Sequence, residues 1–170
     1  EIVEKSRIQV AELLNADPSE IIFTSGATES NNLAIKSIAQ NYFTDDFQVI
    51  TCKTEHKCVL ESCYFLEQKK IKVHYLDVSE AGLINLKDLE ELIKIKPSLV
   101  SIMHANNEIG VLQPLKEIGD LCKKYNVIFH SDIAQSLGTT SVDVQFHNLH
   151  AASISAHKFY GPKGVGALYL

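Results

Sequence analysis

The chain has 170 residues, of which 45% are hydrophobic and 22% are charged, and its formal net charge is -5. These values are typical of roughly one globular domain that can bury a core. The acidic balance and the lack of a long basic run argue against nucleic-acid binding through a broad positive face. No apolar stretch approaches the roughly 18 residues that a membrane-spanning helix needs, and we expect no signal peptide at the start.

Segments with helical and strand-like patterns alternate along the chain. A helix is expected from Ile2 to Leu14, ending at Asn15 ahead of Asp17-Pro18. In chain order, further helices are expected at about 28–42, 59–66, 86–93 and 115–122, and strands at 21–23, 47–51, 71–75, 99–103, 127–129, 151–154 and 165–170. Repeated strand–helix–strand units predict a three-layer α/β fold with helices on both faces of a mostly parallel sheet. Ligands bind such sheets at the carboxyl ends of the strands.

The cysteines and the start of the chain bear on its context. The four cysteines show neither CxxC spacing nor the density of a secreted disulfide framework. We expect Cys52, Cys58, Cys63 and Cys122 to be free thiols in a reducing compartment, the cytoplasm or, in a eukaryote, the mitochondrial matrix. Because Glu1 already falls inside a helical pattern, we interpret the chain as part of a longer protein.

Lys158 stands between an apolar run, 151–157, and a turn punctuated by glycines, 159–164. We expect its ammonium group to lose hydration there, which favours the neutral, nucleophilic amine. Such lysines form Schiff bases with carbonyl compounds, including pyridoxal phosphate. The alternative is a lysine whose stem is covered while its head reaches solvent. Ser155 and His157, in the same segment, could bind a phosphate.

A second motif, 24–31, follows the first strand with small residues and opens a helix. Free backbone N–H groups and the positive end of the helix dipole suit a phosphate, and the Thr28 hydroxyl adds a donor. Plain N-capping by Ser25 or Thr28 explains the same residues without a ligand. No Gly-Lys-Ser/Thr follows, so this is not a Walker loop.

Three more polar groups follow strands. His56 could stack on a planar ring or transfer protons, or it could be an ordinary surface histidine. Asn107 could donate its amide to a phenolate or carboxylate, although turn formation also explains the Asn-Asn pair and Gly110. Asp132, at the mouth of a buried strand, needs a cationic partner such as a protonated pyridine nitrogen, unless it or Ser131 caps a helix.

Taken in order, these segments resemble the cysteine desulfurases of the NifS/IscS group, class V of the fold-type I pyridoxal phosphate enzymes. The resemblance covers essentially the whole chain and runs through FTSGATESNNLAIK, TEHKCVLESC, SIMHANNEIGVLQP, HSDIAQSLG and SAHKFYGPKGVGALY. It implies a Schiff base at Lys158, a contact between Asp132 and the pyridine nitrogen, and a proton-transfer role for His56 beside its stacking. The remaining implied cofactor contacts are Gln135 and Asn107 to the phenolate oxygen, Ala134 against the ring, and Ala27, Thr28, Ser155 and His157 to the phosphate.

The resemblance also implies what the chain does not contain. Family members carry a sulfur-accepting cysteine and a substrate-carboxylate arginine later in their sequences, so residues 1–170 are expected to be an incomplete large domain without the small C-terminal domain and the N-terminal strand. It further implies a homodimer that converts L-cysteine to L-alanine and passes persulfide sulfur to an iron–sulfur scaffold or to tRNA thiolation. We expect weak cofactor binding and no turnover from this part alone. The cysteines present are expected to be buried structural thiols.

Two departures and several alternatives accompany this interpretation. Family members commonly have glycine at the position of Ala156, where the methyl group of alanine should be tolerated if φ is negative. They commonly have a smaller residue at the position of Ile133. A selenocysteine lyase, a β-lyase, a class V aminotransferase or an inactive partner-binding remnant would keep the same ring contacts. A metal site at His147, His150 and His157 lacks a matched ligand set on a firm element, and we expect no metal.

Overall fold

A computed structural model describes residues 1–42, 44–94 and 98–170. The helices are α1 (Ile2–Leu14), α2 (Ala27–Asn41), α3 (Lys57–Gln68), α4 (Leu86–Ile93) and α5 (Leu115–Lys124), with the 3-10 helices η1 (Pro18–Glu20) and η2 (Ala156–Phe159). The strands are β1 (Ile21–Thr24), β2 (Gln48–Cys52), β3 (Lys72–Leu76), β4 (Ser98–Ser101), β5 (Ile128–Asp132), β6 (Ala151–Ser155) and β7 (Gly166–Tyr169). Each predicted helix and strand is present, and the two 3-10 helices are additions.

The strands form one sheet in the order β1-β7-β6-β5-β4-β2-β3. The five strands from β6 to β3 in this order are parallel to their neighbours. Strand β7 runs antiparallel to both β6 and β1. The link between β6 and β7 holds only η2 and a glycine turn, too short for a parallel crossover. The predicted α/β fold with a mostly parallel sheet is confirmed.

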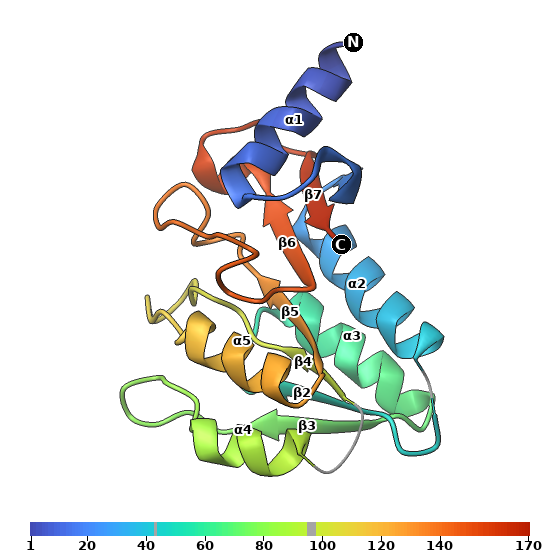
Figure 1. The fold of residues 1–170 in the computed structure, drawn as a ribbon. Coiled ribbons are helices and arrows are strands. Elements are labelled where there is room, and N and C mark those ends of the chain that lie inside the picture. Colours follow the sequence, from blue (N-terminus) through green and yellow to red (C-terminus); the bar gives the residue numbers. More distant parts are fainter. Residues whose placement is uncertain (43, 95–97) are drawn as a thin grey trace.

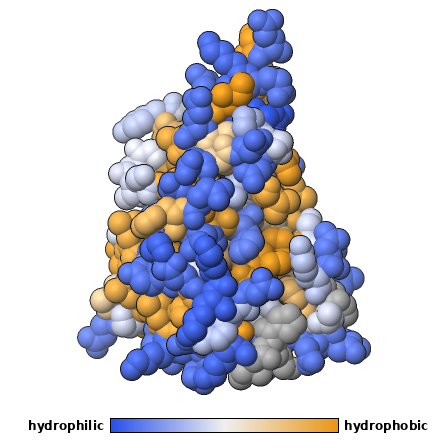
Figure 2. All heavy atoms as spheres, in the orientation of Figure 1, coloured by the Kyte–Doolittle hydropathy of each residue, from blue (hydrophilic) through white to orange (hydrophobic). Residues whose placement is uncertain are grey.

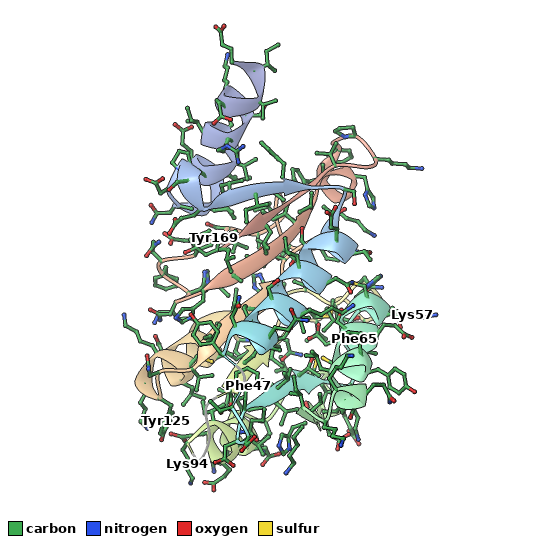
Figure 3. The ribbon with its side chains drawn as sticks, turned by 90° about the vertical axis from the view of Figure 1, so that its right-hand side faces the viewer. Phe47, Lys57, Phe65, Lys94, Tyr125 and Tyr169 are labelled. Carbon is green, nitrogen blue, oxygen red and sulfur yellow. The ribbon has the colours of Figure 1, made fainter. Side chains whose placement is uncertain are left out.

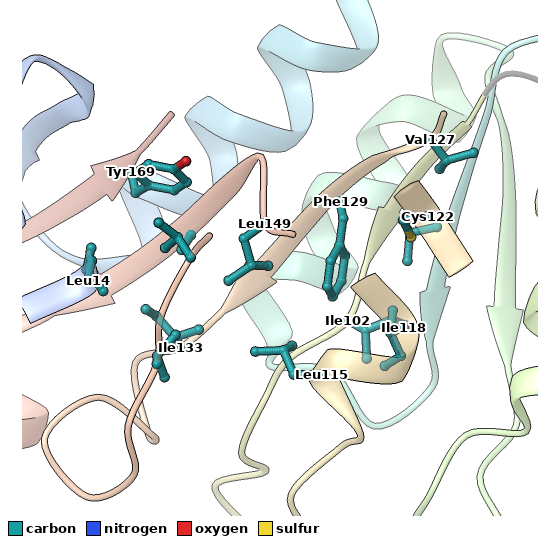
Figure 4. Packing of buried hydrophobic residues seen from close by; sticks show 14 of the residues in the cluster. Leu14, Ile102, Leu115, Ile118, Cys122, Val127, Phe129, Ile133, Leu149 and Tyr169 are labelled. Atoms are coloured by element: carbon teal, nitrogen blue, oxygen red, sulfur yellow. The ribbon is translucent and has the colours of Figure 1, made fainter. Parts of the chain in front are cut away.

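Helices cover both faces of this sheet (Figure 1). On one face, Ala34, Ile35 and Ile38 of α2 pack in a buried cluster with residues of α3. On the other face, α1, α4 and α5 share a larger cluster, and Figure 4 shows Ile118 of α5 beside Phe129 of β5. Because helices cover both faces of the sheet, most side chains of the central strands β2, β4, β5 and β6 are buried and are apolar or paired. Polar groups that can meet a ligand are expected where these strands end.

The carboxyl ends of the parallel strands therefore define one edge of the molecule. In Figure 3, Lys57, which opens α3 just after the carboxyl end of β2, lies on the opposite side from Tyr125, which precedes β5. Strand β1 ends at the same edge as β6, since both run antiparallel to β7. The loops after β1, β2, β4, β5 and β6 thus meet there.

The start of the chain differs from this compact body. Helix α1 projects beyond the sheet, with Ile2 83% and Val3 56% exposed, and apolar surface is visible along it in Figure 2. Its last turn is anchored, because Val144 N donates to Leu14 O at 2.9 Å. Within the described residues, no helix combines the length and apolar character needed to cross a bilayer.

Candidate active site

A cavity of about 400 Å³ opens at the carboxyl-end edge of the sheet. It gathers loops from across the sheet, although the residues that line it are scattered between positions 25 and 164. All ten residues that the sequence indicated line this cavity: Ala27, Thr28, His56, Asn107, Asp132, Ala134, Gln135, Ser155, His157 and Lys158. The structure thus brings the complete predicted set together, and the individual roles stay predictions.

The amino end of α2 forms one wall of the cavity. Gly26 is the N-cap residue, and no side chain caps the helix, so neither Ser25 nor Thr28 takes the capping role considered above. Instead, the Ser25 N–H and hydroxyl donate to Glu29 Oε2 at 2.6 and 2.7 Å. The N–H groups in the first turn of α2 lack acceptors within the helix. The positive end of the helix dipole therefore faces the cavity. This wall can bind an anion.

Close backbone packing holds that wall in place. A Cβ on Gly166 would lie 2.5 Å from both the Gly26 Cα and the Ile154 oxygen, so only glycine lets β7 pass directly against the turn before α2. Beside this contact, the Ser155 Oγ and the His157 Nδ1 lie 3.0 Å apart and share a hydrogen bond. A hydroxyl and an imidazole therefore lie at the same end of the cavity as the free amides.

Asp132 is the last residue of β5 and is only 5% exposed. Its Oδ2 accepts from Asn31 Nδ2 at 2.7 Å, and its Oδ1 accepts from the Ala134 N–H at 2.9 Å. The pKa of Asp132 is raised above its ordinary value, because the effect of burial exceeds the lowering by these two hydrogen bonds and by the charges of His56 and Lys158. A cation in the cavity would stabilise the ionised carboxylate.

Helix capping does not explain Asp132. The residues after β5 form a turn rather than a helix, and the Ser131 hydroxyl donates to Ile102 O at 2.7 Å. The carboxylate of Asp132 is therefore held toward the cavity by its own turn.

His56 is the N-cap residue of α3, and its Nδ1 accepts from the Cys58 N–H at 3.2 Å. The proton of the neutral ring therefore lies on Nε2. The Cys58 Sγ is 3.0 Å from the same Nδ1 and lines the cavity, although the side chain is buried. The interpretation of Cys58 as a purely structural thiol is thus incomplete.

The two asparagines after β4 have different tasks. The buried Asn106 shapes the loop: its Oδ1 accepts from the Glu108 and Ile109 N–H groups at 2.8 and 2.9 Å. Gly110 completes the turn at φ 69°. This arrangement leaves Asn107 exposed and lining the cavity. Turn formation therefore accounts for Asn106 and Gly110, and the amide of Asn107 is free to meet a ligand.

One argument from the sequence is wrong. Lys158 is exposed and lies on η2, not at a buried junction, so burial does not strip its ammonium group of water. The chain leaves the sheet directly after Ser155 in a single 3-10 turn, which carries Lys158 outward. The lysine nevertheless lines the same cavity as Asp132, whose pKa its charge lowers. Ala156 at the family's glycine position has a negative φ, as its methyl requires.

The family model for class-V aminotransferases matches residues 1–170. The chain belongs to the class-V aminotransferase family. It is 60% identical to the mitochondrial cysteine desulfurase of Drosophila melanogaster and 56% identical to the cysteine desulfurase IscS of Rickettsia africae (strain ESF-5), in each case over 99% of this chain. These matches confirm the resemblance to the NifS/IscS cysteine desulfurases.

Solved structures of this class-V group agree. SspA in complex with cysteine has a TM-score of 0.95 at 45% identity, and a NifS-like protein has a TM-score of 0.94 at 43% identity. The two matches cover 99% and 98% of this chain, respectively. The chain spans 36% and 41% of the two relatives' sequences and 48% and 46% of the two solved chains.

Several residues at or behind the cavity of this class-V chain were not indicated by the sequence reasoning. Cys58, Met103, Lys163 and Gly164 line the cavity, and the buried Asn31 holds Asp132 from behind it. Asn31 carried a usable signal, since a fully buried amide on the apolar face of α2 needs a partner. The others are single residues whose position depends on the packing of separate loops.

The histidines considered for a metal site are divided between two places. His157 contacts Ser155 in the cavity, whereas the His147 ring packs edge-on against Phe146, with 5.0 Å between centroids. Across the three described ranges, no group of three His, Cys, Asp or Glu side chains could hold a metal ion.

Proposed function

We propose that this chain is the pyridoxal phosphate-binding large domain of a cysteine desulfurase. The reaction converts L-cysteine to L-alanine, and the sulfur leaves as a persulfide on a cysteine outside residues 1–170. The observation that carries the proposal is that the Lys158 amine and the buried Asp132 carboxyl line one cavity. Cysteine desulfurases among the relatives, and a solved relative in complex with cysteine, support the choice of substrate.

The residues of the cavity fit the cofactor chemically. The Asp132 carboxylate suits a protonated pyridine nitrogen, and the free amides of α2 suit a phosphate. Thr28, Ser155 and His157 would add phosphate donors, with Ala27 providing one of the amides. His56 and Ala134 would lie against the two ring faces, and Asn107 and Gln135 would contact the phenolate oxygen. When bound, pyridoxal phosphate supplies an aldehyde for a Schiff base with Lys158 and a ring that withdraws electrons.

The chain's own groups divide the remaining work. The Lys158 amine, when free, would be a base for the α-proton of cysteine. When the His56 ring is neutral, its proton lies on Nε2, because Nδ1 accepts from the Cys58 N–H. In that form His56 presents a hydrogen-bond donor to the cavity rather than the first base. A cation beside Asp132 would favour the ionised carboxylate, which in turn would keep that cation protonated.

An absorbance titration with pyridoxal phosphate tests the proposal. We expect a band near roughly 400 nm from the protonated Schiff base, absent in Lys158→Ala. Lys163→Ala is the matched control, because Lys163 is the other lysine that lines the cavity. Borohydride reduction followed by peptide mass spectrometry should place the adduct on Lys158. An unchanged band in Lys158→Ala, or an adduct on Lys163, would contradict the assignment.

The limits of residues 1–170 give a second test. We propose that the complete enzyme is a homodimer, located in the cytoplasm or the mitochondrial matrix, that hands sulfur to an iron–sulfur scaffold or to tRNA-thiolation proteins. The 170-residue chain alone should bind the cofactor weakly and should not turn over cysteine, because the persulfide cysteine and the carboxylate-binding arginine lie outside it. Alanine formation from cysteine by this chain alone would overturn that expectation.

A further inference from the structure

Glu55 precedes His56 in the loop between β2 and α3, and none of the roles proposed above uses it. Its side chain is only 6% exposed. Its Oε1 accepts a hydrogen bond from the Met103 backbone N–H at 2.6 Å. Since Met103 belongs to the loop after β4, this buried carboxyl connects two neighbouring loops at the carboxyl-end edge.

A second hydrogen bond joins the same two loops. Asn106 Nδ2 donates to Thr54 O at 2.7 Å, one residue away from Glu55. The first loop carries His56 and the second carries Asn107, and both residues line the main cavity. Both also line a second cavity of about 430 Å³, of which Glu55 forms part of the wall. Glu55 thus lies next to His56, one of the residues that the two cavities share.

Among the residues that the structure describes, no cation pairs with the Glu55 carboxyl. The titratable groups against it are Cys52 of β2, whose Sγ is 3.3 Å from Oε1, Cys63 of α3 and Asp132 of β5, and each is negative when ionised. Lys53 and Lys57 line the second cavity but are exposed, and Lys53 is paired with Asp77 at 2.6 Å. Within the described residues, the buried Oε2 has no hydrogen-bond partner.

These surroundings disfavour an ionised carboxylate. Burial raises the pKa of Glu55 to about 8, the Met103 N–H opposes this, and the charge of Asp132 adds to it. An unpaired buried carboxylate is costly, so such a group takes up a proton instead. We propose that Glu55 is a positioning residue, a neutral carboxylic acid that ties the loop carrying His56 to the loop carrying Met103 and Asn107.

The inference separates two neighbouring acids by their protonation state. Asp132 accepts hydrogen bonds at both oxygens and faces the charges of His56 and Lys158, whereas Glu55 accepts from one backbone amide and one thiol. Burial raises the pKa of both acids, and only Asp132 faces positive charges that oppose the rise. A cation bound in the cavity would therefore favour the ionised form of Asp132, while Glu55 keeps its proton and holds structure. This deepens the proposed function, and its readout with cofactor rests on that function.

The protonation state is measured on the protein without cofactor. Infrared difference spectroscopy near neutral pH should show the C=O stretch of a protonated carboxylic acid in the unmodified protein and its loss in Glu55→Gln. Glu108→Gln is the matched control, because Glu108 is an exposed carboxylate on the wall of the same second cavity. A band of unchanged intensity in Glu55→Gln, or its absence from the unmodified protein, overturns the inference.

The positioning role is measured through pyridoxal phosphate affinity in the complete enzyme. Glutamine has the shape of the neutral acid and keeps an oxygen for the Met103 N–H, so Glu55→Gln should bind within about 3-fold of the unmodified protein. Glu55→Ala and the shorter Glu55→Asp lose that contact and should bind about 10-fold more weakly. The Ala variant serves only if circular dichroism shows that it folds.

The relative pyridoxal phosphate affinities of Glu55→Gln and Glu55→Asp test the role of Glu55 even if Glu55→Ala does not fold. Tighter binding by Glu55→Asp than by Glu55→Gln would mean that a negative charge is required, and it would overturn the neutral-acid role. Wild-type-like affinity in all three variants would overturn positioning. If the unmodified protein bound no pyridoxal phosphate, the proposed function would fail, whereas the infrared result for Glu55 would still stand or fall on its own.

Discussion

Buried polar side chains differ in their hydrogen bonding between the middle of the sheet and its carboxyl-end edge. In the middle, His130 of β5 is paired on both sides: Ser101 Oγ lies 2.9 Å from its Nδ1, and Ser153 Oγ lies 2.9 Å from its Nε2. Burial lowers the pKa of His130 to about 3, so the ring is neutral and both its nitrogens are used. This row of side chains across β4, β5 and β6 stabilises the fold.

At the edge, polar atoms are buried without being paired. Asn31 Oδ1, Glu55 Oε2 and His104 Nδ1 have no hydrogen-bond partner among the residues that the structure describes. A fourth such atom, Thr51 Oγ1, lies one residue before the end of β2. Native structures seldom leave such groups unpaired without a reason. The paired His130 supports the fold, whereas the acids near the strand ends differ in role: Asp132 faces the cavity, and Glu55 links two loops.

Asp132→Asn should give the largest effect at the edge. Removing the charge that faces the cofactor should weaken pyridoxal phosphate binding about 100-fold or more, as for a broken buried charge pair. The unloaded protein should change in unfolding free energy by less than about 1 kcal/mol, since burial already disfavours the charge. Affinity by fluorescence titration and stability by urea unfolding separate the two. Comparable losses in both would make Asp132 a structural residue like His130.

Two glycines, Gly166 beside the anion-binding wall and Gly119 on α5, sharpen the comparison further. A Cβ at Gly166 would lie 2.5 Å from Gly26 Cα, and a Cβ at Gly119 on α5 would lie 1.9 Å from His147 O. Both Gly→Ala variants should lose about 1–3 kcal/mol of stability by overpacking. Only Gly166→Ala should also weaken cofactor binding in the protein that remains folded, because only it displaces the amino end of α2. Equal affinities in the two variants would count against the anion-binding wall.

Ser153→Ala tests the middle of the sheet alone. It leaves His130 Nε2 buried without an acceptor or donor, which should cost about 1–3 kcal/mol in thermal or urea unfolding. Cofactor affinity of the folded variant should stay near that of the unmodified protein. A stable Ser153→Ala variant with weakened cofactor binding would show that this row of side chains supports the site rather than the stability of the fold.

The last expected effect is a pH slope in stability. The pKa of folded Glu55 lies at about 8, above its ordinary value of 4.5, so the folded state binds more protons between these values. Stability should therefore fall as pH rises from about 5 to about 8, by at most about 1.4 kcal/mol per pH unit from this group. Glu55→Gln should remove that part of the slope in urea unfolding series, whereas Glu108→Gln should not. Parallel curves for unmodified protein and Glu55→Gln would show that Glu55 is ionised.

Periodicity predicted the elements well, because each strand here is a short apolar run and each helix has a buried face. It could not give β7 its antiparallel direction, which follows from the length of the β6–β7 connection. For the site, strand-end position was sufficient to select Asp132, His56 and Asn107. Lys158 was selected for a wrong reason, since burial was inferred from its apolar neighbours and η2 carries it outward. Asn31 and Glu55 depend on contacts with residues 101 and 48 positions away, which no local pattern contains.

The pairing of β1 with β7 has a consequence for synthesis. Ile21 is registered with Tyr169, so the turn that starts α2 is seated by residues made almost at the end of this stretch of chain. Contacts so distant in sequence form late in folding. While a ribosome is still emitting residues before Gly166, β1 lacks β7, the strand with which it pairs, and Gly166 is not yet present to pack against Gly26. Loading of a cofactor should therefore begin only after the last strand has emerged.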